Sequence, residues 1–363
     1  PDGELMPRVS VVMPSYESAP YLRSAVESIL HQSEGDIELI IVQEMGARDG
    51  TEAILNEFDD ERVKIVRNDS PTGLVRSLNR GFAMARSEYI ARMDADDVSM
   101  PQRLEKQAEF LDNNPSIGVV GSAVRHIDER GRHLGTRTYP TSPGLVIWNM
   151  HFDCAMCHPS TMFRRSVFEE AGGYSPAAKD WEDYELWTRI MRRHSMSNVP
   201  DVLLDYRIHD GAVSVRKDDE QRQHIVDCGR RAMEVTMARP VDRDFVRSLI
   251  FPYTIASRRN AIGAAWLLNY LYRSYRIWYR ERSREDLMAV KDDVAERMSH
   301  IMARSVKAAP LAVPMILWQA SRAGPGVSAR LVPSTIRRGI ERLNGTAAAK
   351  MDRRSSMVTP STP

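Results

Sequence analysis

The chain has 363 residues, of which 42% are hydrophobic and 27% are charged. This composition is typical of a globular protein with one large or two ordinary domains, and it excludes a disordered or fibrous chain. Three cysteines are too few for a disulfide framework and favour a reducing compartment, and no apolar run is long enough to span a membrane. Because no secretory pattern is present, we expect a cytoplasmic protein. The chain begins at Pro1, so an N-terminal piece could precede it.

The net charge of +1 conceals two halves of opposite sign. Residues 1–215 contain 23 Lys and Arg against 34 Asp and Glu, whereas residues 216–363 contain 27 against 15. An acidic first half argues against nucleic-acid binding and favours a site that holds cations. The basic second half could face anionic lipid, an acidic partner or the first half itself.

The first 120 residues alternate short apolar runs with helical patterns. Within residues 20–31, for example, Leu22, Val26 and Ile29 fall on one helical face. Strands are predicted at 9–13, 37–42, 63–66, 88–93 and 117–120, and helices at 20–31, 51–58, 74–85 and from about 101. This alternation predicts an α/β fold with a Rossmann-like, mostly parallel sheet and helices on both faces.

The pattern changes after Gly121. A hairpin is predicted at 126–139, a helix at 180–194, a strand at 198–208, and helices near 220–238, 255–281 and 284–306. We therefore expect an α/β domain over 1–215 and a helical C-terminal region over 216–322. Gly, Ser, Pro and Thr become frequent from 323 onward, which predicts a flexible tail over 323–363.

The loops after the first, second and fourth predicted strands should carry the chemistry, because ligands bind beyond the carboxyl ends of parallel strands. After the fourth strand come Asp94, Asp96 and Asp97. Carboxylates this close repel one another unless a cation compensates, and hard divalent ions prefer oxygen ligands. The alternative is that Asp97 caps the next helix and the other two are solvated.

Seven segments, in the same order along residues 8–215, resemble the family 2 glycosyltransferases. They are Val9–Tyr16, Ile40–Thr51, Leu78–Gly81, Tyr89–Asp97, His158–Ser160, Trp181–Trp187 and Tyr206–His209. The resemblance implies a GT-A fold and transfer of a sugar from a nucleotide-sugar with inversion at the anomeric carbon.

The resemblance also implies roles for individual residues. Asp94-Ala95-Asp96 resembles the DXD motif, which holds Mn²⁺ or Mg²⁺ against the donor diphosphate, and a metal bridging the phosphates stabilises the leaving group. The implied metal ligands are Asp94, Asp96 and His209, and the implied donor-binding residues are Pro14, Ser15, Tyr16, Glu17, Glu44, Asn79, Asp94, Ala95 and Arg207. Glu44 stands where the family has Asp, so the identity of the base stays open, with a UDP-sugar favoured.

Inversion requires a group that accepts the proton of the acceptor hydroxyl. Glu182-Asp183 resembles the Glu-Asp pair of the family, and we expect Asp183 to be the base, with its pKa raised by Glu182 and Glu185. The alternative is an acidic first helical turn that favours the helix dipole.

Two other motifs are weak. Cys154-Ala-Met-Cys157-His158 fits a haem-attachment or half-zinc pattern, but Cys228 is the only other cysteine. Gln319-Ala-Ser-Arg322-Ala323 resembles the Gln-x-x-Arg-Trp motif of processive synthases but has alanine at its last position, so we expect a non-processive enzyme.

The segment from Trp266 to Arg282 combines aromatic and basic residues. It could lie at a membrane surface, placing the protein at the inner membrane face, or pack on the catalytic domain or in a homodimer. The expected acceptor is a glycan, a lipid-linked sugar or a polysaccharide. Rival functions are a sugar nucleotidyltransferase, although Pro14–Pro20 lacks the glycines of that class, and a degenerate nucleotide-sugar binding module.

Overall fold

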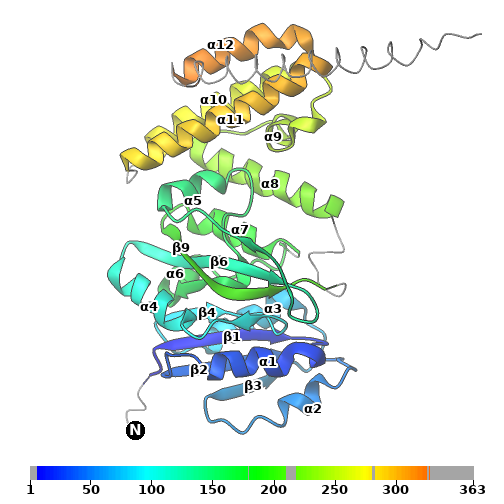
Figure 1. Ribbon diagram of the computed structural model, residues 1–363, viewed down its shortest axis with the longest axis vertical. Helices are drawn as coiled ribbons and strands as arrows, with labels where there is room; N and C mark the ends of the chain where they lie inside the picture. The colour runs from blue at the N-terminus through cyan, green and yellow to red at the C-terminus, as the bar shows by residue number, and fades with distance from the viewer. Residues whose placement is uncertain (1–5, 179, 210–217, 280–282, 325–326, 328–363) are drawn as a thin grey trace, which may run out of the picture. The chain divides into compact units, whose positions relative to one another are not determined.

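The computed structural model describes residues 6–178, 180–209, 218–279, 283–324 and 327 (Figure 1). The chain divides into two compact units, residues 1–232 and 233–363, and each is described by itself. The predicted flexible tail from 323 lies outside the described residues except for positions 323, 324 and 327.

The first unit is built on one nine-stranded sheet. Its strands are β1 (Val9–Ser15), β2 (Ile37–Gln43), β3 (Val63–Arg67), β4 (Tyr89–Arg92), β5 (Val98–Ser99), β6 (Ile117–Ile127), β7 (His133–Arg137), β8 (Met162–Arg164) and β9 (Ser195–Arg207). Strands β3-β2-β1-β4 are parallel, β8 is antiparallel to its neighbours β4 and β6, and β6 is parallel to β9. Strand β7 pairs with β6 in the predicted hairpin.

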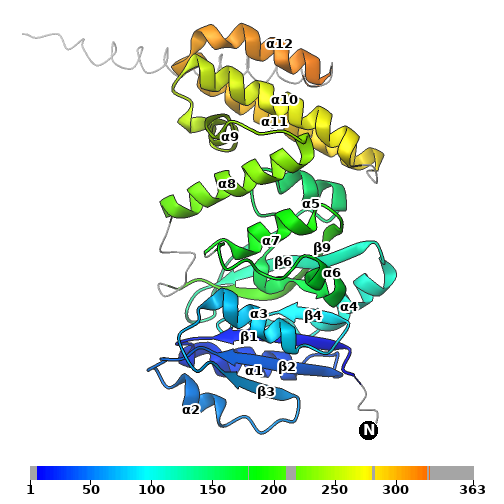
Figure 2. The same ribbon diagram turned by 180° about the vertical axis from the view of Figure 1, so that it is seen from behind.

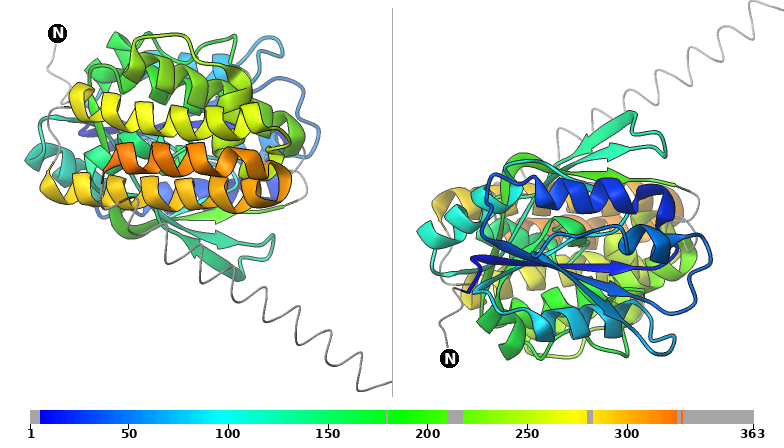
Figure 3. Two further views of the ribbon diagram at one scale, coloured as in Figure 1. Left: turned by 90° about the horizontal axis from the view of Figure 1, so that it is seen from above. Right: turned by 90° about the horizontal axis from the view of Figure 1, so that it is seen from below.

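The helices of the first unit cover both faces of this sheet (Figures 1 and 2). They are α1 (Ala19–Leu30), α2 (Thr51–Leu55), α3 (Leu74–Met84), α4 (Arg103–Asn113), α5 (Pro143–Asn149), α6 (Arg165–Glu170), α7 (Glu182–Ile190), the 3₁₀ turn η1 (His158–Ser160) and the first part of α8 (Asp218–Met237). Helix α1 lies on one face of β1 and β2 and α3 lies on the other (Figure 3, right).

Successive side chains of β1 point to opposite faces of the sheet, which explains why helices pack on both faces. Val9, Val11 and Met13 belong to the same buried cluster as the apolar side of α1. Val12 points the other way, because successive strand residues face opposite sides, and there it meets Gly81 of α3. A strand covered on both faces is apolar at most positions, and residues 11–14 of β1 and 39–42 of β2 are continuous apolar runs; the buried polar residues Ser10 and Glu38 lie near the strand starts. The predicted Rossmann-like α/β fold is confirmed.

The second unit is helical. It contains α9 (Arg243–Ile250), η3 (Pro252–Thr254), α10 (Arg258–Trp278), α11 (Arg284–Ala308), η4 (Pro310–Ala312) and α12 (Val313–Ala323). Leu267, Leu271 and Tyr275 of α10 are buried, so one side of the aromatic-rich segment forms the core of this unit. None of the helices within the described part of the chain is long and apolar enough to cross a membrane.

Candidate functional site

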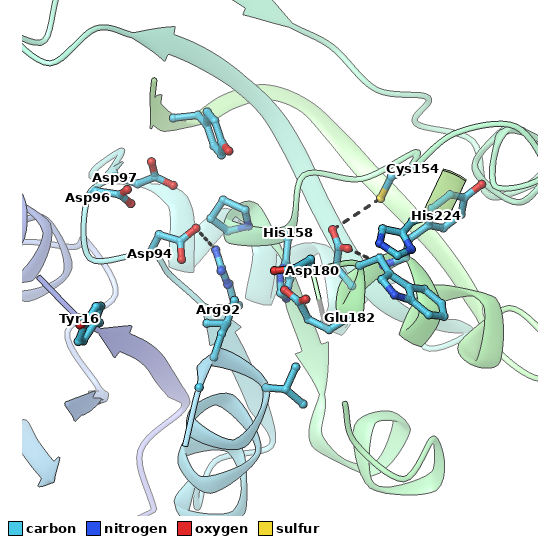
Figure 4. A pocket seen from close by; sticks show the side chains of 18 of the residues that line it. Tyr16, Arg92, Asp94, Asp96, Asp97, Cys154, His158, Asp180, Glu182 and His224 are labelled. Carbon is cyan, nitrogen blue, oxygen red and sulfur yellow. Dashed lines mark hydrogen bonds and ion pairs between the residues drawn. The ribbon is translucent and has the colours of Figure 1, made fainter. Parts of the chain in front are cut away.

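A cavity of about 1000 Å³ opens at the carboxyl end of the parallel strands (Figure 4). The loops after β1 and β4 and the ends of α3, α7 and β9 contribute to it. Helix α8, in the part that belongs to the first unit, also reaches it. Its lining includes Tyr16, Thr72, Gly73, Arg76, Arg92, Asp94, Asp96, Asp97, Asp153, Cys154, His158, Trp181, Glu182, Asp183, Arg207 and His224. The acidic loop and the Glu-Asp pair therefore face one space, as the sequence predicts.

The acidic loop after β4 presents three carboxylates at one point. Asp94, Asp96 and Asp97 each offer an oxygen atom, and these atoms lie within 4.8 Å of one another. Asp97 does not cap α4, which begins at Arg103; its Oδ1 accepts from the backbone N–H of Arg207 at 2.8 Å. Its Oδ2 is buried and has no hydrogen-bond partner among the residues that the structure describes.

This arrangement fits a divalent cation. Burial raises the pKa of Asp97 well above its ordinary value, and the charges of Asp96 and Asp94 add to the rise. A buried, unpartnered oxygen within a cluster of like charges is costly unless a cation or proton neutralises it. Three carboxylate oxygens at this spacing are the donor set that Mg²⁺ or Mn²⁺ prefers.

The buried guanidinium of Arg92 lies directly beneath this loop (Figure 4). Its Nη1 donates to Oδ2 of Asp94, and its Nε is buried without a hydrogen-bond partner among the described residues. Burial raises the pKa of Asp94, Arg92 opposes the rise, and the neighbouring Asp96 adds to it. Sequence reasoning missed Arg92, although a charged residue at the end of an otherwise apolar strand was a usable signal.

The end of β9 is bonded to the acidic loop. Arg207 donates from Nε to the carbonyl of Asp96 at 2.7 Å, and its guanidinium lies 4.5 Å from the ring centroid of Tyr21. Nε2 of His209 lies 2.9 Å from Oδ2 of Asp96. The structure thus brings His209 to the acidic loop, 113 positions away in sequence.

Glu182 and Asp183, in the first turn of α7, face the cavity from another side. Burial raises the pKa of Glu182 to about 7, and the charge of Asp183 adds to the rise. Burial also raises the pKa of Asp183, with a contribution from Asp153. The largest cause is therefore burial, and not the repulsion by Glu182 and Glu185 that the sequence led us to expect; Glu185 forms an ion pair with Arg189 at 2.7 Å one turn along the helix.

Only part of the predicted donor-binding loop at residues 14–17 lies at the cavity. Tyr16 lines it, with 53% of its surface exposed. Pro14 pairs with Val42 inside the sheet, and Ser15 bonds to a neighbouring serine hydroxyl at 3.0 Å. Glu17 lies just beyond Tyr16, in a left-handed backbone conformation with φ of 46°.

Glu44 is not among the residues that line the cavity, but it bonds to residues that do. Its carboxylate accepts from the backbone N–H groups of Thr72 and Gly73 at 2.8 and 2.6 Å and from the Ser77 hydroxyl at 3.1 Å. Burial would raise the pKa of Glu44, but these hydrogen bonds outweigh it and hold the pKa below the ordinary value. Thr72 and Gly73 do line the cavity, so Glu44 orients a segment of the cavity lining.

Asn79 is bonded to protein rather than directed at the cavity. Its Nδ2 donates to the carbonyl of Tyr174 at 2.8 Å, and its Oδ1 accepts from the N–H of the same residue at 2.9 Å. The Tyr174 hydroxyl in turn lies 2.8 Å from Nε2 of His158. Burial holds the pKa of His158 well below its ordinary value, and Arg92 adds to the effect, so this imidazole is neutral.

The Cys-x-x-Cys-His pattern does not form a metal centre. Cys157 is buried, and His158 is bonded to Tyr174. Across the described ranges, the only group of three or more metal-ligating side chains is the acidic loop. Cys154 instead lines the cavity, with its Sγ 3.9 Å from Oδ2 of Asp183.

Helix α8 closes the cavity beside the Glu-Asp pair. The ring of His224 stacks on Trp181 with centroids 5.5 Å apart, and the guanidinium of Arg231 lies 4.9 Å from the same indole ring. Sequence reasoning missed His224, because nothing in the helical pattern of residues 220–238 marks it as facing a site more than forty positions upstream.

Comparisons with known proteins agree with this geometry. The family model for glycosyl transferase family 2 matches residues 10–172. The chain is 33% identical over 221 residues to the putative glycosyltransferase EpsE of Bacillus subtilis, covering 59% of this chain and 74% of the relative. It is also 33% identical over 211 residues to the O-antigen biosynthesis glycosyltransferase WbnJ of Escherichia coli, covering 57% and 82%.

A solved structure shares the fold. The crystal structure of S. aureus TarS 1-349 in complex with UDP-GlcNAc superposes with a TM-score of 0.53 at 14% identity, covering 92% of both chains. Together with the matched family model and the relatives, this fold assigns the chain to glycosyl transferase family 2: it is a glycosyltransferase with a GT-A-like catalytic fold.

Proposed function

We propose that the protein is a metal-dependent, inverting and non-processive glycosyltransferase that moves a sugar from a nucleotide-sugar to a hydroxyl group of a glycan or lipid-linked acceptor. The observation that supports this most is that Asp94, Asp96 and Asp97 share one cavity with Glu182 and Asp183. A UDP-sugar is favoured as the donor, since the TarS structure contains UDP-GlcNAc.

Asp94, Asp96 and Asp97 would hold the divalent cation, with His209 beside Asp96. Such an ion, when bound, supplies positive charge that stabilises a departing diphosphate. Arg207 adds a second positive charge on the same side. Its Nε donates to the carbonyl of Asp96 and its backbone N–H donates to the carboxylate of Asp97, so the loop already has its shape before a ligand binds.

Asp183 would accept the proton of the acceptor hydroxyl. As the acceptor oxygen forms its bond to the anomeric carbon, the bond from that carbon to the diphosphate oxygen breaks and the hydroxyl proton passes to Asp183. Attack from the side opposite the leaving group inverts the configuration. Of the two carboxylates, Asp183 is the more exposed to the cavity, which favours it over Glu182 as the base.

The non-processive assignment is supported by the second unit. Gln319, the first position of the segment that resembles the processive motif, is buried, and its Oε1 accepts from Asn269 at 2.9 Å. Gln319 therefore stabilises the packing of α12 on α10 and is not available to an acceptor.

Incubation with labelled nucleotide-sugars, Mn²⁺ and candidate acceptors tests the proposal. Asp96→Asn should lower transfer by roughly a hundredfold or more through loss of charge stabilisation, and Asp183→Asn by a similar factor through loss of the base. Asp59→Asn, the same change at an exposed position, should have no effect. Pyrophosphate-dependent exchange would instead indicate a nucleotidyltransferase, and donor binding without turnover a degenerate binding module.

A further inference from the structure

Helix α12 of the second unit presents an apolar outer face. Its inner side buries Ile316, Gln319, Ala320 and Ala323. Its outer side and the preceding turn η4 expose four large apolar side chains: Leu311 (75%), Met315 (39%), Leu317 (43%) and Trp318 (49%). We call these four residues the α12 face.

The α12 face is not needed for the core of its own unit. Helix α12 already packs across α10 and α11 through its inner side (Figures 1 and 3). Met315 and Trp318 are three residues apart and lie on the same side of the helix, with Arg322 one turn further. Single exposed apolar residues are ordinary, but a contiguous row on one helix marks an interaction surface.

The stretch of sequence that contains the α12 face carries positive charges only. No Asp or Glu occurs between Arg297 and Ile340, whereas this stretch contains seven Lys and Arg. Arg304 and Lys307, near the end of α11, and Arg322 of α12 are exposed. The guanidinium of Arg322 lies 4.7 Å from the ring centroid of Trp318, so a basic group accompanies the largest apolar one.

We propose that the α12 face docks on an anionic lipid surface. Leu311, Met315 and Trp318 would enter the boundary between head groups and acyl chains, and Arg304, Lys307 and Arg322 would contact lipid phosphates. Apolar and aromatic side chains beside basic ones are the features by which helices bind in the plane of a membrane. We place this surface on α12 rather than on the aromatic-rich segment of α10, because Leu267, Leu271 and Tyr275 of that segment are buried.

A second copy of the chain fits the α12 face less well than an anionic lipid surface does. In a two-fold dimer the same surface faces itself, so the basic set Arg304, Lys307 and Arg322 of one copy would face the same set on the other. Like charges at such an interface oppose association, and no acidic residue of this stretch is available to compensate. An anionic lipid surface has the complementary charge.

Co-sedimentation of the full chain with vesicles tests the docking surface. The wild type should bind phosphatidylcholine vesicles that contain phosphatidylglycerol, bind pure phosphatidylcholine vesicles less, and dissociate as salt is raised. The triple variant Leu311→Ser, Met315→Ser, Trp318→Ser should lose roughly tenfold or more in binding. Leu134→Ser, the same kind of change at a residue 57% exposed on β7, should leave binding unchanged.

Two further variants separate docking from misfolding. Trp318→Phe keeps the apolar contact and should bind nearly as the wild type does. The double variant Lys307→Glu, Arg322→Glu should lose binding to anionic vesicles while its thermal unfolding stays close to wild type, because both residues are exposed. The proposal is wrong if the wild type does not sediment with anionic vesicles. It is equally wrong if the wild type is dimeric and the triple variant monomeric, since a second copy then occupies the face.

Discussion

Arg92 is a buried positive charge that acts on both groups of carboxylates in the cavity, the acidic loop after β4 and the Glu182-Asp183 pair. Burial raises the pKa of Asp94, Glu182 and Asp183, and in each case the charge of Arg92 opposes that rise. Among the residues that the structure describes, its side chain bonds to Asp94, and its influence on Glu182 and Asp183 acts through space. Arg92 is therefore a positioning residue that helps to keep these carboxylates ionised.

Replacing Arg92 by methionine should leave Asp94 without its countercharge. Removing one partner of a buried ion pair costs about 3–5 kcal/mol in the free energy of unfolding. The loss should shrink as pH falls, because protonation of Asp94 removes the uncompensated charge. Urea unfolding at several pH values measures this, and Arg92→Lys should recover part of the loss. A loss of the same size at every pH would contradict the account.

Glu182 should make the folded state less stable as pH rises. Its pKa in the folded state is about 7, against an ordinary value of 4.5, so the folded protein holds this proton more tightly than the unfolded chain does. The stability conferred by the protonated carboxyl is complete below pH 4.5 and is lost as pH rises through 7. Glu182→Gln should therefore be more stable than wild type above pH 7, by at most about 3 kcal/mol, and about equal below pH 4.5.

Thermal unfolding across this pH range checks the prediction for Glu182. Glu185→Gln is the matched control, because it removes the ion pair with Arg189 and should bring no gain at high pH. A stability difference between Glu182→Gln and wild type that does not change with pH would count against the role assigned to Glu182.

At the scale of elements, α3 connects the sheet to the cavity. Its first turn brings Gly73 and Arg76 to the lining, and Asn79 holds the backbone of Tyr174. Its register on the sheet is set by Gly81, where an added Cβ would lie 2.4 Å from Cγ1 of Val12 and 3.1 Å from Cγ2 of Val42. The close approach of α3 to β1 and β2 requires glycine at this position.

Gly81→Ala should therefore lower the free energy of unfolding by about 1–3 kcal/mol through overpacking. Val12→Ala removes the methyl group that clashes, so the double variant should be less destabilised than the sum of the two single changes. Gly135→Ala, where nothing lies within 4 Å of the added Cβ, is the control and should be close to neutral. Strict additivity of the Gly81 and Val12 changes would contradict this packing.

The sequence predicts those helices and strands that can be recognised from the pattern of their own residues. Strands β1 and β2 contain continuous apolar runs at residues 11–14 and 39–42, and α1 has its apolar residues at helical spacing, so each element can be recognised from its own sequence. Strands β5 and β8 have two and three residues and exist only through their pairing with β9, β4 and β6. No window of sequence contains that information.

The candidate site also combines features that a local motif predicts with contacts that depend on how distant segments pack. Asp94, Asp96 and Asp183 stand in recognisable motifs next to strand and helix ends, so their approach to one cavity follows from the topology of the sheet. The contacts of Glu44 and Asn79 depend on which backbone groups pack beside them, and the motif gives no sign that both bond to protein. His224 reaches the cavity only because α8 packs on Trp181.

At the scale of the whole molecule, the uneven charge follows the chemistry of each part. The acidic excess of residues 1–215 includes the carboxylates that line the cavity, where a divalent cation would neutralise them. The basic excess of residues 216–363 includes the groups around the α12 face. Charges of opposite sign therefore serve ligands of opposite sign in the two parts of the chain.

The measurement that tests the central claim most directly is calorimetric titration of UDP and GDP in Mn²⁺ and in EDTA. We predict that one nucleotide binds the wild type with Mn²⁺ and at least about tenfold more weakly in EDTA, because the acidic loop repels a bare diphosphate. Asp96→Asn should lose the metal-dependent part of binding. Asp183→Asn should bind as the wild type does while its transfer of sugar falls by roughly a hundredfold or more. Equal affinity in Mn²⁺ and EDTA, together with unaltered binding by Asp96→Asn, would contradict the account.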